Sequence, residues 1–447
     1  MRHTKKITTY TFFALISIII AIILPKGYWD IFFGGDQAEI YLNAKRIGNL
    51  HIELLGLPSV WGFYHPGPAL RFYFNIIYLF SFGSIFLFFL LDTLIKLSIL
   101  FISLKIIKEK IKFQTQDILF SILFCFSSIY ILSLFKTPWS YGIIIILLLL
   151  GSTYTLLKQY FKAFLLFNIS IQVSIISIIP ITILVIIFAS EIYLDIKNRI
   201  KPYLIGFLSI WSFTIYEAIR NKGGNLFRII SLDKPLNENN IQSDILISSN
   251  VLFNFKFEFI FLAILLITSI LTFKYQQKTF KKFIIATYFI FSTSIFLPFI
   301  LKKNEFYYFA YIVPFLLILL LLLLKSTGIK LKLFIYVTLF VPIIINLFSS
   351  SDYYISRKWN PFPLSEIIQV STEIKKNTSG KINLYITGEK EGALALPFLI
   401  ILDILSVQVD NYKPSNERIT IYTDEINCKR IQNRGKNGSK SICYSID

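Results

Sequence analysis

Repeated apolar runs constrain this 447-residue chain more than any other feature of its sequence. Runs of about 20 apolar residues match the length of helix that crosses the roughly 30 Å hydrocarbon layer of a membrane. Hydrophobic residues make up 55% of the sequence and charged residues 16%, whereas a soluble domain carries about a quarter charged residues. The pattern predicts an all-α polytopic membrane protein with about eleven spans. We place them at 7–24, 85–104, 117–135, 140–157, 162–177, 179–194, 203–219, 257–273, 283–301, 308–324 and 332–349.

Three of these segments need a further argument. Pro180 allows either one kinked helix or two spans over residues 162–194, and the sequence leaves both open. The first run ends in IILPKGYWD, which lacks a small-x-small cleavage site, so we expect an uncleaved first span. Residues 68–84, PALRFYFNIIYLFSFGS, are short and aromatic, and we predict a helix that lies in the membrane interface.

Basic residues gather in alternate loops between the predicted spans. The basic side holds residues 2–6, 105–112, 158–162, 197–201, 274–282 and 325–332. Because lysine and arginine accumulate in cytoplasmic loops, we expect a cytoplasmic N-terminus, with residues 25–84 and the C-terminus outside a bacterial inner or plasma membrane. The net charge of +19 then reflects basic residues that lie near anionic headgroups, so membrane lipids are expected as partners. Nucleic acid is not expected, since no basic soluble domain with a recognition motif is present.

The composition changes near residue 350, which predicts domains at 1–350 and 351–447. In the second domain, residues 364–377 and GALALPFLIILDIL predict helices, whereas KINLYITGE and RITIYTDE predict strands. We therefore expect a small extracytoplasmic α/β domain. Cys428 and Cys443 both lie in it, and either a disulfide or two free thiols fits the sequence.

The first outer loop, 25–84, concentrates the candidate chemistry of the N-terminal half. If the segment after Gly35 is helical, Asp36, Glu39, Asn43 and Arg46 share one arc of the helix, and the apolar residues beside them can rest on the membrane. A carboxylate there can act as a general base for an acceptor hydroxyl. The alternative is structural, because Asp36 followed by Glu39 also resembles a capping box at a helix N-terminus.

Other polar residues are candidates for substrate binding. Tyr64 and His65 precede Pro66, Gly67 and Pro68, which fix the backbone and present the imidazole to a ligand or to a neighbouring loop. No metal site is expected, since no third ligand accompanies the nearby histidines at metal-binding spacing. Four outer cations can neutralise a lipid phosphate or simply lie at the interface. These are Arg71, Arg220, Lys302 and Lys303; Glu217 and Glu305 stand beside them at the outer ends of spans.

Few ionisable residues fall near the centres of the predicted spans. Asp92 and Lys96 are one helical turn apart, and we expect them to pair with each other. Ion-coupled transporters usually need buried charge at mid-depth, so this distribution does not favour one. The sequence contains no P-loop, G-x-S-x-G or H-E-x-x-H motif. No cofactor is expected.

The order of several segments resembles the GT-C superfamily of membrane glycosyltransferases. These segments are the first span, GGDQAEIYLNAKRIGN, GFYHPGPALRFYFNIIYLFSFGS, FNISIQVSIISIIPITI, IYEAIRNKGGN and LKKNEFYYFAYIVP. The likeness covers roughly residues 1–350 and is greatest to the RgtA/B/C/D-like and protein-mannosyltransferase-like branches.

The resemblance implies a GT-C-like fold and a sugar donor linked to polyprenyl phosphate, with a glycan, lipid or protein as acceptor. It also implies that Asp36 is the catalytic base of an inverting, metal-independent transfer at the outer face. Many relatives have an Asp-Glu pair at this place, whereas here Gln37 follows, so Glu39 becomes the candidate second carboxylate. His65 matches a position that lines the donor cavity. The product would be a cell-envelope glycan such as lipopolysaccharide.

Two other function classes stay open from the sequence. An O-antigen polymerase or ligase also uses lipid-linked glycans at the outer face, but its large outer loop is expected late among the spans. A lipid or glycan transporter would instead need a continuous polar groove through its helices.

Overall fold

The computed structural model describes residues 35–46, 65–223, 276–301, 310–328, 331–338, 364–378, 381–387, 391–409, 417–422 and 443–446, with Gly56 and single residues at 267, 269, 270, 273 and 340. The chain divides into two compact units. The first comprises Met1–Phe13, His51–Phe80 and Phe88–Ser350, and the second comprises Ala14–Leu50, Ser81–Leu87 and Ser351–Asp447. The boundary predicted at residue 350 remains a prediction.

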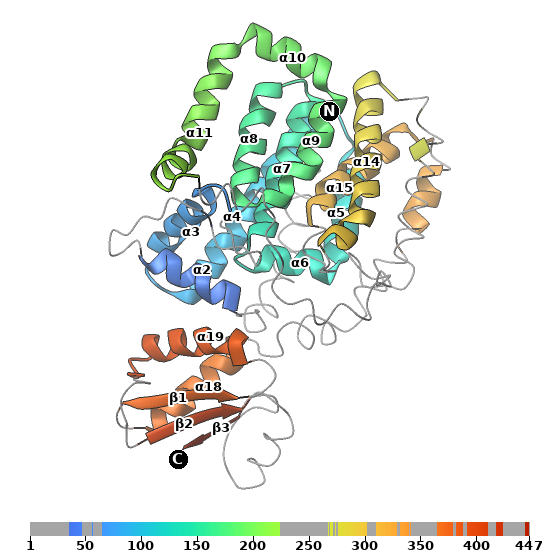
Figure 1. Cartoon of the computed structure of the whole chain (residues 1–447). Helices are drawn as coiled ribbons and strands as arrows, with labels where there is room; N and C mark the ends of the chain where they lie inside the picture. Colours follow the sequence, from blue (N-terminus) through green and yellow to red (C-terminus); the bar gives the residue numbers. More distant parts are fainter. Residues whose placement is uncertain are drawn as a thin grey trace. The chain divides into compact units, whose positions relative to one another are not determined.

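The first unit is helical (Figure 1). It contains α3 (Ala69–Phe80), most of α4 (Ile85–Ile106), α5 (Thr115–Ser127), α6 (Ile129–Lys136), α7 (Ser140–Leu156), α8 (Tyr160–Val173), α9 (Ile178–Ile187), α10 (Ala189–Asn198), α11 (Ile200–Arg220), α14 (Lys278–Leu301) and α15 (Val313–Ser326).

Two helices that are apolar all round form the centre of this unit. Nearly every residue of α7 is buried, and α15 is buried from Val313 to Leu324. A helix that is hydrophobic on all sides must be enclosed by other elements, and α7 packs against both α8 and α15. Gly151 permits the close approach of α8, because a Cβ atom there would lie 2.4 Å from the Phe167 ring. The neighbouring helices run alongside one another in Figure 1.

Apolar length alone supports fewer spans than the sequence predicts. Within the described residues, Ile85–Ile111 and Ile200–Arg220 are long and apolar enough to cross a membrane. A third span is added if Ile175–Ile187 and Ala189–Asn198 count as one. Eleven spans therefore remains a prediction, and those at 7–24 and 257–273 lie largely outside the described residues. The exposed apolar surface of α11, with Ile219 at 75% exposure, is typical of a helix in lipid.

Two predicted spans are broken. The segment 117–135 is divided at Ser128, which has an extended backbone between α5 and α6. The segment 179–194 bends by 85° between α9 and α10, at the buried Phe188. Pro180 does not cause the break between α8 and α9. The break lies at Ser174, whose backbone is extended. Pro180 lies in the first turn of α9, where the backbone N–H groups have no partner within the helix, so the missing N–H of proline breaks no helical hydrogen bond.

Helix α3 is too short to cross a membrane. Its 12 residues correspond to about 18 Å, so the expectation that residues 68–84 do not form a span is confirmed. The helix buries Leu70, Phe74 and Ile77 and exposes Ile76 and Leu79, which gives it one protein-facing side.

The second unit is an α/β assembly. It contains α2 (Gly35–Lys45), α18 (Leu364–Asn377), β1 (Ile382–Thr387), α19 (Glu391–Ile404), β2 (Glu417–Tyr422) and β3 (Cys443–Ile446). The strand order is β1-β2-β3, with β1 parallel to β2 and β2 antiparallel to β3. Leu384 pairs with Ile419, and Ile421 with Tyr444, so buried apolar residues meet across the sheet. The helices and strands predicted at 364–425 are confirmed, whereas β3 was not predicted.

The cysteines differ in state. Cys125 is a buried free thiol in α5, and Cys443 in β3 is disulfide-bonded. Cys428, the partner that the sequence offers, lies outside the described residues. The alternative of two free thiols is therefore wrong for Cys443.

Candidate functional site

Gly56 and residues 65–68, called the His65 loop below, lie together in the first unit. The Gly56 N–H donates a 3.0 Å hydrogen bond to the His65 carbonyl. Gly56 must be glycine here, because a Cβ atom would lie 2.6 Å from His65 Cβ and 2.9 Å from the Gly67 carbonyl oxygen. The loop then enters α3 directly after Pro68.

Arg71 reaches back to the same loop. It is 6% exposed, and its Nε donates a 3.1 Å hydrogen bond to the Gly56 carbonyl. Gly56 thus contacts both His65 and Arg71 through its backbone. The structure therefore brings together two of the residues that the sequence analysis selected.

The His65 side chain is half-buried, and its ring nitrogen Nδ1 is enclosed. Among the residues that the structure describes, this atom has no hydrogen-bond partner. Burial lowers the pKa of the imidazole to about 4, so the ring is neutral near pH 7. A neutral imidazole offers a ligand one donor and one acceptor, but no positive charge.

Helices α8 and α11 lie beside this loop. A Cβ atom on Gly67 would lie 2.3 Å from Cδ of Gln172, which shows how closely α8 approaches. Nε2 of Gln172 donates a 2.5 Å hydrogen bond to the Ile210 carbonyl of α11. Phe72 of α3 also meets Phe213 of α11, with 5.5 Å between ring centroids. The loop, α3, α8 and α11 therefore form one connected cluster.

Glu217 and Arg220 lie at the C-terminal end of α11 and differ in exposure. Glu217 is 9% exposed and accepts a hydrogen bond from Nδ2 of Asn221, while Arg220 is exposed. One turn earlier, Oγ1 of Thr214 is buried and lacks a partner within the described part of the chain. A buried hydroxyl of this kind needs a partner such as water or a ligand. Nothing in the sequence pattern singled out Thr214.

Asp36 and Glu39 belong to the second unit. The helix α2 begins at Gly35, so Asp36 lies inside its first turn rather than at the capping position before it. Asp36 is exposed and Glu39 is half-buried. Desolvation by surrounding protein raises the pKa of the Asp36 carboxyl above 3.8.

The apolar side of α2 is covered by protein. Ala38, Ile40 and Ala44 are buried, and α2 packs against α19. The expectation that this side rests on the membrane is therefore wrong. Nζ of Lys45 lies 2.8 Å from Oδ2 of Asp403 in α19.

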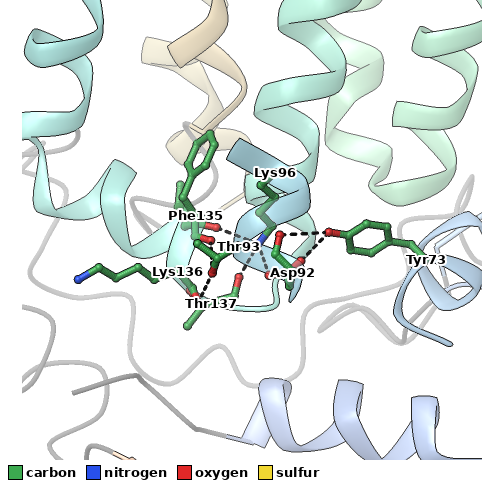
Figure 2. Close-up of polar contacts among 8 residues, drawn as sticks. Tyr73, Asp92, Thr93, Lys96, Phe135, Lys136 and Thr137 are labelled. Carbon is green, nitrogen blue, oxygen red and sulfur yellow. Dashed lines mark hydrogen bonds and ion pairs between the residues drawn. The ribbon is translucent and has the colours of Figure 1, made fainter. Parts of the chain in front are cut away.

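A polar network in the first unit was predicted only in part (Figure 2). Nζ of Lys96 lies 2.6 Å from Oδ2 of Asp92, and both side chains are completely buried, so the expected pairing is confirmed. The Tyr73 hydroxyl donates a 2.8 Å hydrogen bond to Oδ1 of Asp92. Lys96 also donates to the carbonyls of Leu134 at 3.3 Å and Thr137 at 2.6 Å. These tertiary partners carry no signal in the local sequence.

Tyr64, Lys302, Lys303 and Glu305 lie outside the described residues. Within the described part of the chain, no group of three His, Cys, Asp or Glu side chains could hold a metal ion.

Comparison with known proteins shows the fold. No family model matches the sequence, and no curated protein matches it. The crystal structure of ArnT from Cupriavidus metallidurans in the apo state has a TM-score of 0.61 and 8% identity, with 98% of each chain covered. The crystal structure of ArnT from the same organism bound to undecaprenyl phosphate has a TM-score of 0.59 and 10% identity, with 97% of each chain covered. These structures give no support to the RgtA/B/C/D-like or protein-mannosyltransferase-like branch. The chain thus shares its fold, over nearly its whole length, with the two ArnT structures.

Proposed function

We propose that this protein is a glycosyltransferase that moves a sugar from a polyprenyl-phosphate donor to a glycan, lipid or protein acceptor. The observation that carries the proposal is the full-length likeness in fold to ArnT, one structure of which holds undecaprenyl phosphate. Helices that are long and apolar enough to cross a membrane support the proposal, because such a donor resides in a membrane. The transfer takes place at the outer face, with the N-terminus in the cytoplasm and the C-terminal residues outside.

The residues of the first loop fit this chemistry. Asp36 is an exposed carboxylate in the first turn of α2 and acts as the general base. It accepts the proton of the acceptor hydroxyl while that oxygen forms a bond to the anomeric carbon. The bond from that carbon to the phosphate oxygen breaks on the opposite face, so the configuration inverts and the polyprenyl phosphate leaves as an anion. Glu39 supports Asp36 as a second carboxylate.

Binding of the lipid phosphate falls to the cluster around α3. Arg71 and Arg220, with Lys302 and Lys303, supply positive charge for the leaving phosphate. His65 binds as a neutral hydrogen-bonding group, because its lowered pKa removes the cationic form near pH 7.

Two further observations support a polar ligand near this cluster. Nδ1 of His65 and Oγ1 of Thr214 are buried without partners among the described residues, and both lie on segments that contact α3 or lead into it. Tyr64, Glu217 and Glu305 complete the proposed binding set. No metal or cofactor takes part in the proposed steps.

The Asp36→Asn variant tests the catalytic assignment. Asparagine preserves size but cannot take up the proton, so turnover should fall by roughly 10²–10⁴-fold at equal protein level. The assay incubates membranes with undecaprenyl-phosphate-linked hexoses and pentoses and measures release of undecaprenyl phosphate by mass spectrometry.

The matched control is Asp403→Asn, which removes an exposed carboxylate of the same unit and should leave turnover unchanged. Full activity of the Asp36→Asn variant would remove Asp36 as the base. Absence of release by the wild-type protein with every donor in the set would contradict the proposed reaction.

A further inference from the structure

Each N–H and O–H donor of the Tyr73 and Lys96 side chains has an acceptor. The ammonium group of Lys96 has three N–H donors and three acceptors, on Asp92, Leu134 and Thr137. Each carboxylate oxygen of Asp92 accepts one bond, from Tyr73 or from Lys96. Charge buried in a membrane helix indicates a specific role. Because these bonds join α3, α4 and the end of α6, the network holds these elements together.

One side of the network caps a helix. The carbonyls at the C-terminal end of an α-helix have no partners within the helix, and a cation there is favourable. Lys96 supplies such a cation to the end of α6 through Leu134 and Thr137. Thr93, also on α4, contributes longer bonds to the carbonyls of Phe135 at 3.4 Å and Lys136 at 3.5 Å. Figure 2 shows these side chains converging on the turn after α6.

The other side of the network holds α3. Four consecutive residues of this helix contact three other segments of the first unit: Arg71 bonds the Gly56 carbonyl, Phe72 meets Phe213 of α11, and Tyr73 and Phe74 contact Asp92 and Phe88 of α4. Helix α3 therefore connects the His65 loop to α4. The hydrogen bond from Tyr73 to Asp92 is a polar contact of α3 with α4.

We propose that Tyr73 and Asp92 are positioning residues that fix α3 and, through Arg71 and Gly56, set the geometry of the His65 loop for binding a lipid phosphate, whereas Lys96 fixes the C-terminal end of α6. The link to lipid phosphate rests on the proposed function. The two sides of the network are separable, since the Tyr73 hydroxyl holds α3 and the Lys96 ammonium holds the end of α6.

The test uses the full-length protein in nanodiscs. Tyr73→Phe removes only the hydroxyl and keeps the ring. Asp92→Asn together with Lys96→Met removes both charges, while the amide oxygen at position 92 can still accept the Tyr73 bond. Tyr193→Phe is the control, because Tyr193 lies on α10 and is 64% exposed. Hydrogen exchange of residues 65–80 and 129–140, affinity for undecaprenyl phosphate and the unfolding temperature are measured for each.

Tyr73→Phe should speed exchange in residues 65–80 and weaken undecaprenyl phosphate binding, each by about five- to tenfold, with little change in unfolding temperature. A merely structural contact would lower the unfolding temperature without this selective loss of affinity. The double variant should speed exchange in residues 129–140 and leave residues 65–80 protected. The control should match the wild type in all three measurements.

Unchanged exchange of residues 65–80 in Tyr73→Phe overturns the positioning of α3. Faster exchange with unchanged affinity overturns the link to the binding site. If the wild-type protein does not bind undecaprenyl phosphate, the proposed function fails and the link to lipid phosphate fails with it. In that case hydrogen exchange still decides whether Tyr73 positions α3.

Discussion

The chain contains two lysine–aspartate pairs of similar length in opposite surroundings. Lys96 and Asp92 lie 2.6 Å apart with both side chains fully buried, whereas Lys45 and Asp403 lie 2.8 Å apart with 46% and 67% of their side chains exposed. The buried pair has three additional hydrogen bonds, from Tyr73 and to two carbonyls. The two distances alone would suggest that both pairs stabilise the fold equally. Removing one partner should lower the free energy of unfolding far more for the buried pair, because water cannot replace the lost contact there.

The largest effect is expected from breaking the buried pair on one side. Lys96→Met leaves the Asp92 carboxylate buried without its cation and should lower the free energy of unfolding by about 3–5 kcal/mol. Denaturant unfolding in detergent measures this loss. Adding Asp92→Asn should restore a large part of it, because the uncompensated charge is then gone. A loss below about 1 kcal/mol in the single variant would show that the buried pair behaves like the exposed one.

A smaller effect is expected from adding a methyl group to the tightly packed region beside Lys96 without changing its charges. A Cβ atom on Gly142 of α7 would lie 2.2 Å from the Leu134 carbonyl oxygen and 3.1 Å from Cε of Lys96. Gly142→Ala should therefore lower the free energy of unfolding by about 1–3 kcal/mol. Gly328→Ala is the matched control, since nothing lies within 4 Å of a Cβ atom there. Equal stability of the two variants would contradict the close packing at Leu134.

His65 extends the comparison to an ionisable group whose enclosed Nδ1 has no hydrogen-bond partner among the described residues. Its folded pKa of about 4 lies below the unfolded value of 6.5, so the unfolded state binds the extra proton first as the pH falls. The wild-type protein should lose stability as the pH drops from about 6.5 to about 4. His65→Gln should reduce this loss, which unfolding temperatures measured across the same pH range will show. Identical pH profiles would mean that His65 is not buried in its neutral form.

The smallest effect is expected at the exposed pair. Lys45→Met should lower the free energy of unfolding by about 0–1 kcal/mol, because both groups remain hydrated when separated. Repeating the measurement near 1 M salt should remove most of the difference, since the screening length is then about 3 Å. A salt-independent loss of several kcal/mol would place this pair in the same class as Asp92 and Lys96.

Features encoded in short segments were predictable from the sequence. The uninterrupted apolar runs identified α7 and α15, alternating residues identified β1 and β2, and the i, i+4 spacing identified the Asp92–Lys96 pair. Each signal is contained within a few turns or one strand, so local periodicity is sufficient to detect it.

Features that depend on distant partners were not predictable. Tyr73 lies 19 residues from Asp92, and Thr137 lies 41 residues from Lys96, so neither contact follows from local spacing. The 85° bend at Phe188 occurs without a proline or glycine in the sequence around it. The sequence suggested a break at Pro180, but the helices are interrupted at Ser174 and Phe188. The candidate site was predicted as a set of residues, but the Gly56 link between His65 and Arg71 required the fold.

The packing of α2 against α19 has a consequence for the order of biosynthesis. Residues 35–45 leave the ribosome more than 300 residues before the helix that covers them, which spans residues 391–404. The apolar side of the segment that carries Asp36 is therefore enclosed only after those further residues have been synthesised. A premature stop codon anywhere before the end of α19 would leave that side uncovered, even in a product that retains every candidate residue of the first loop.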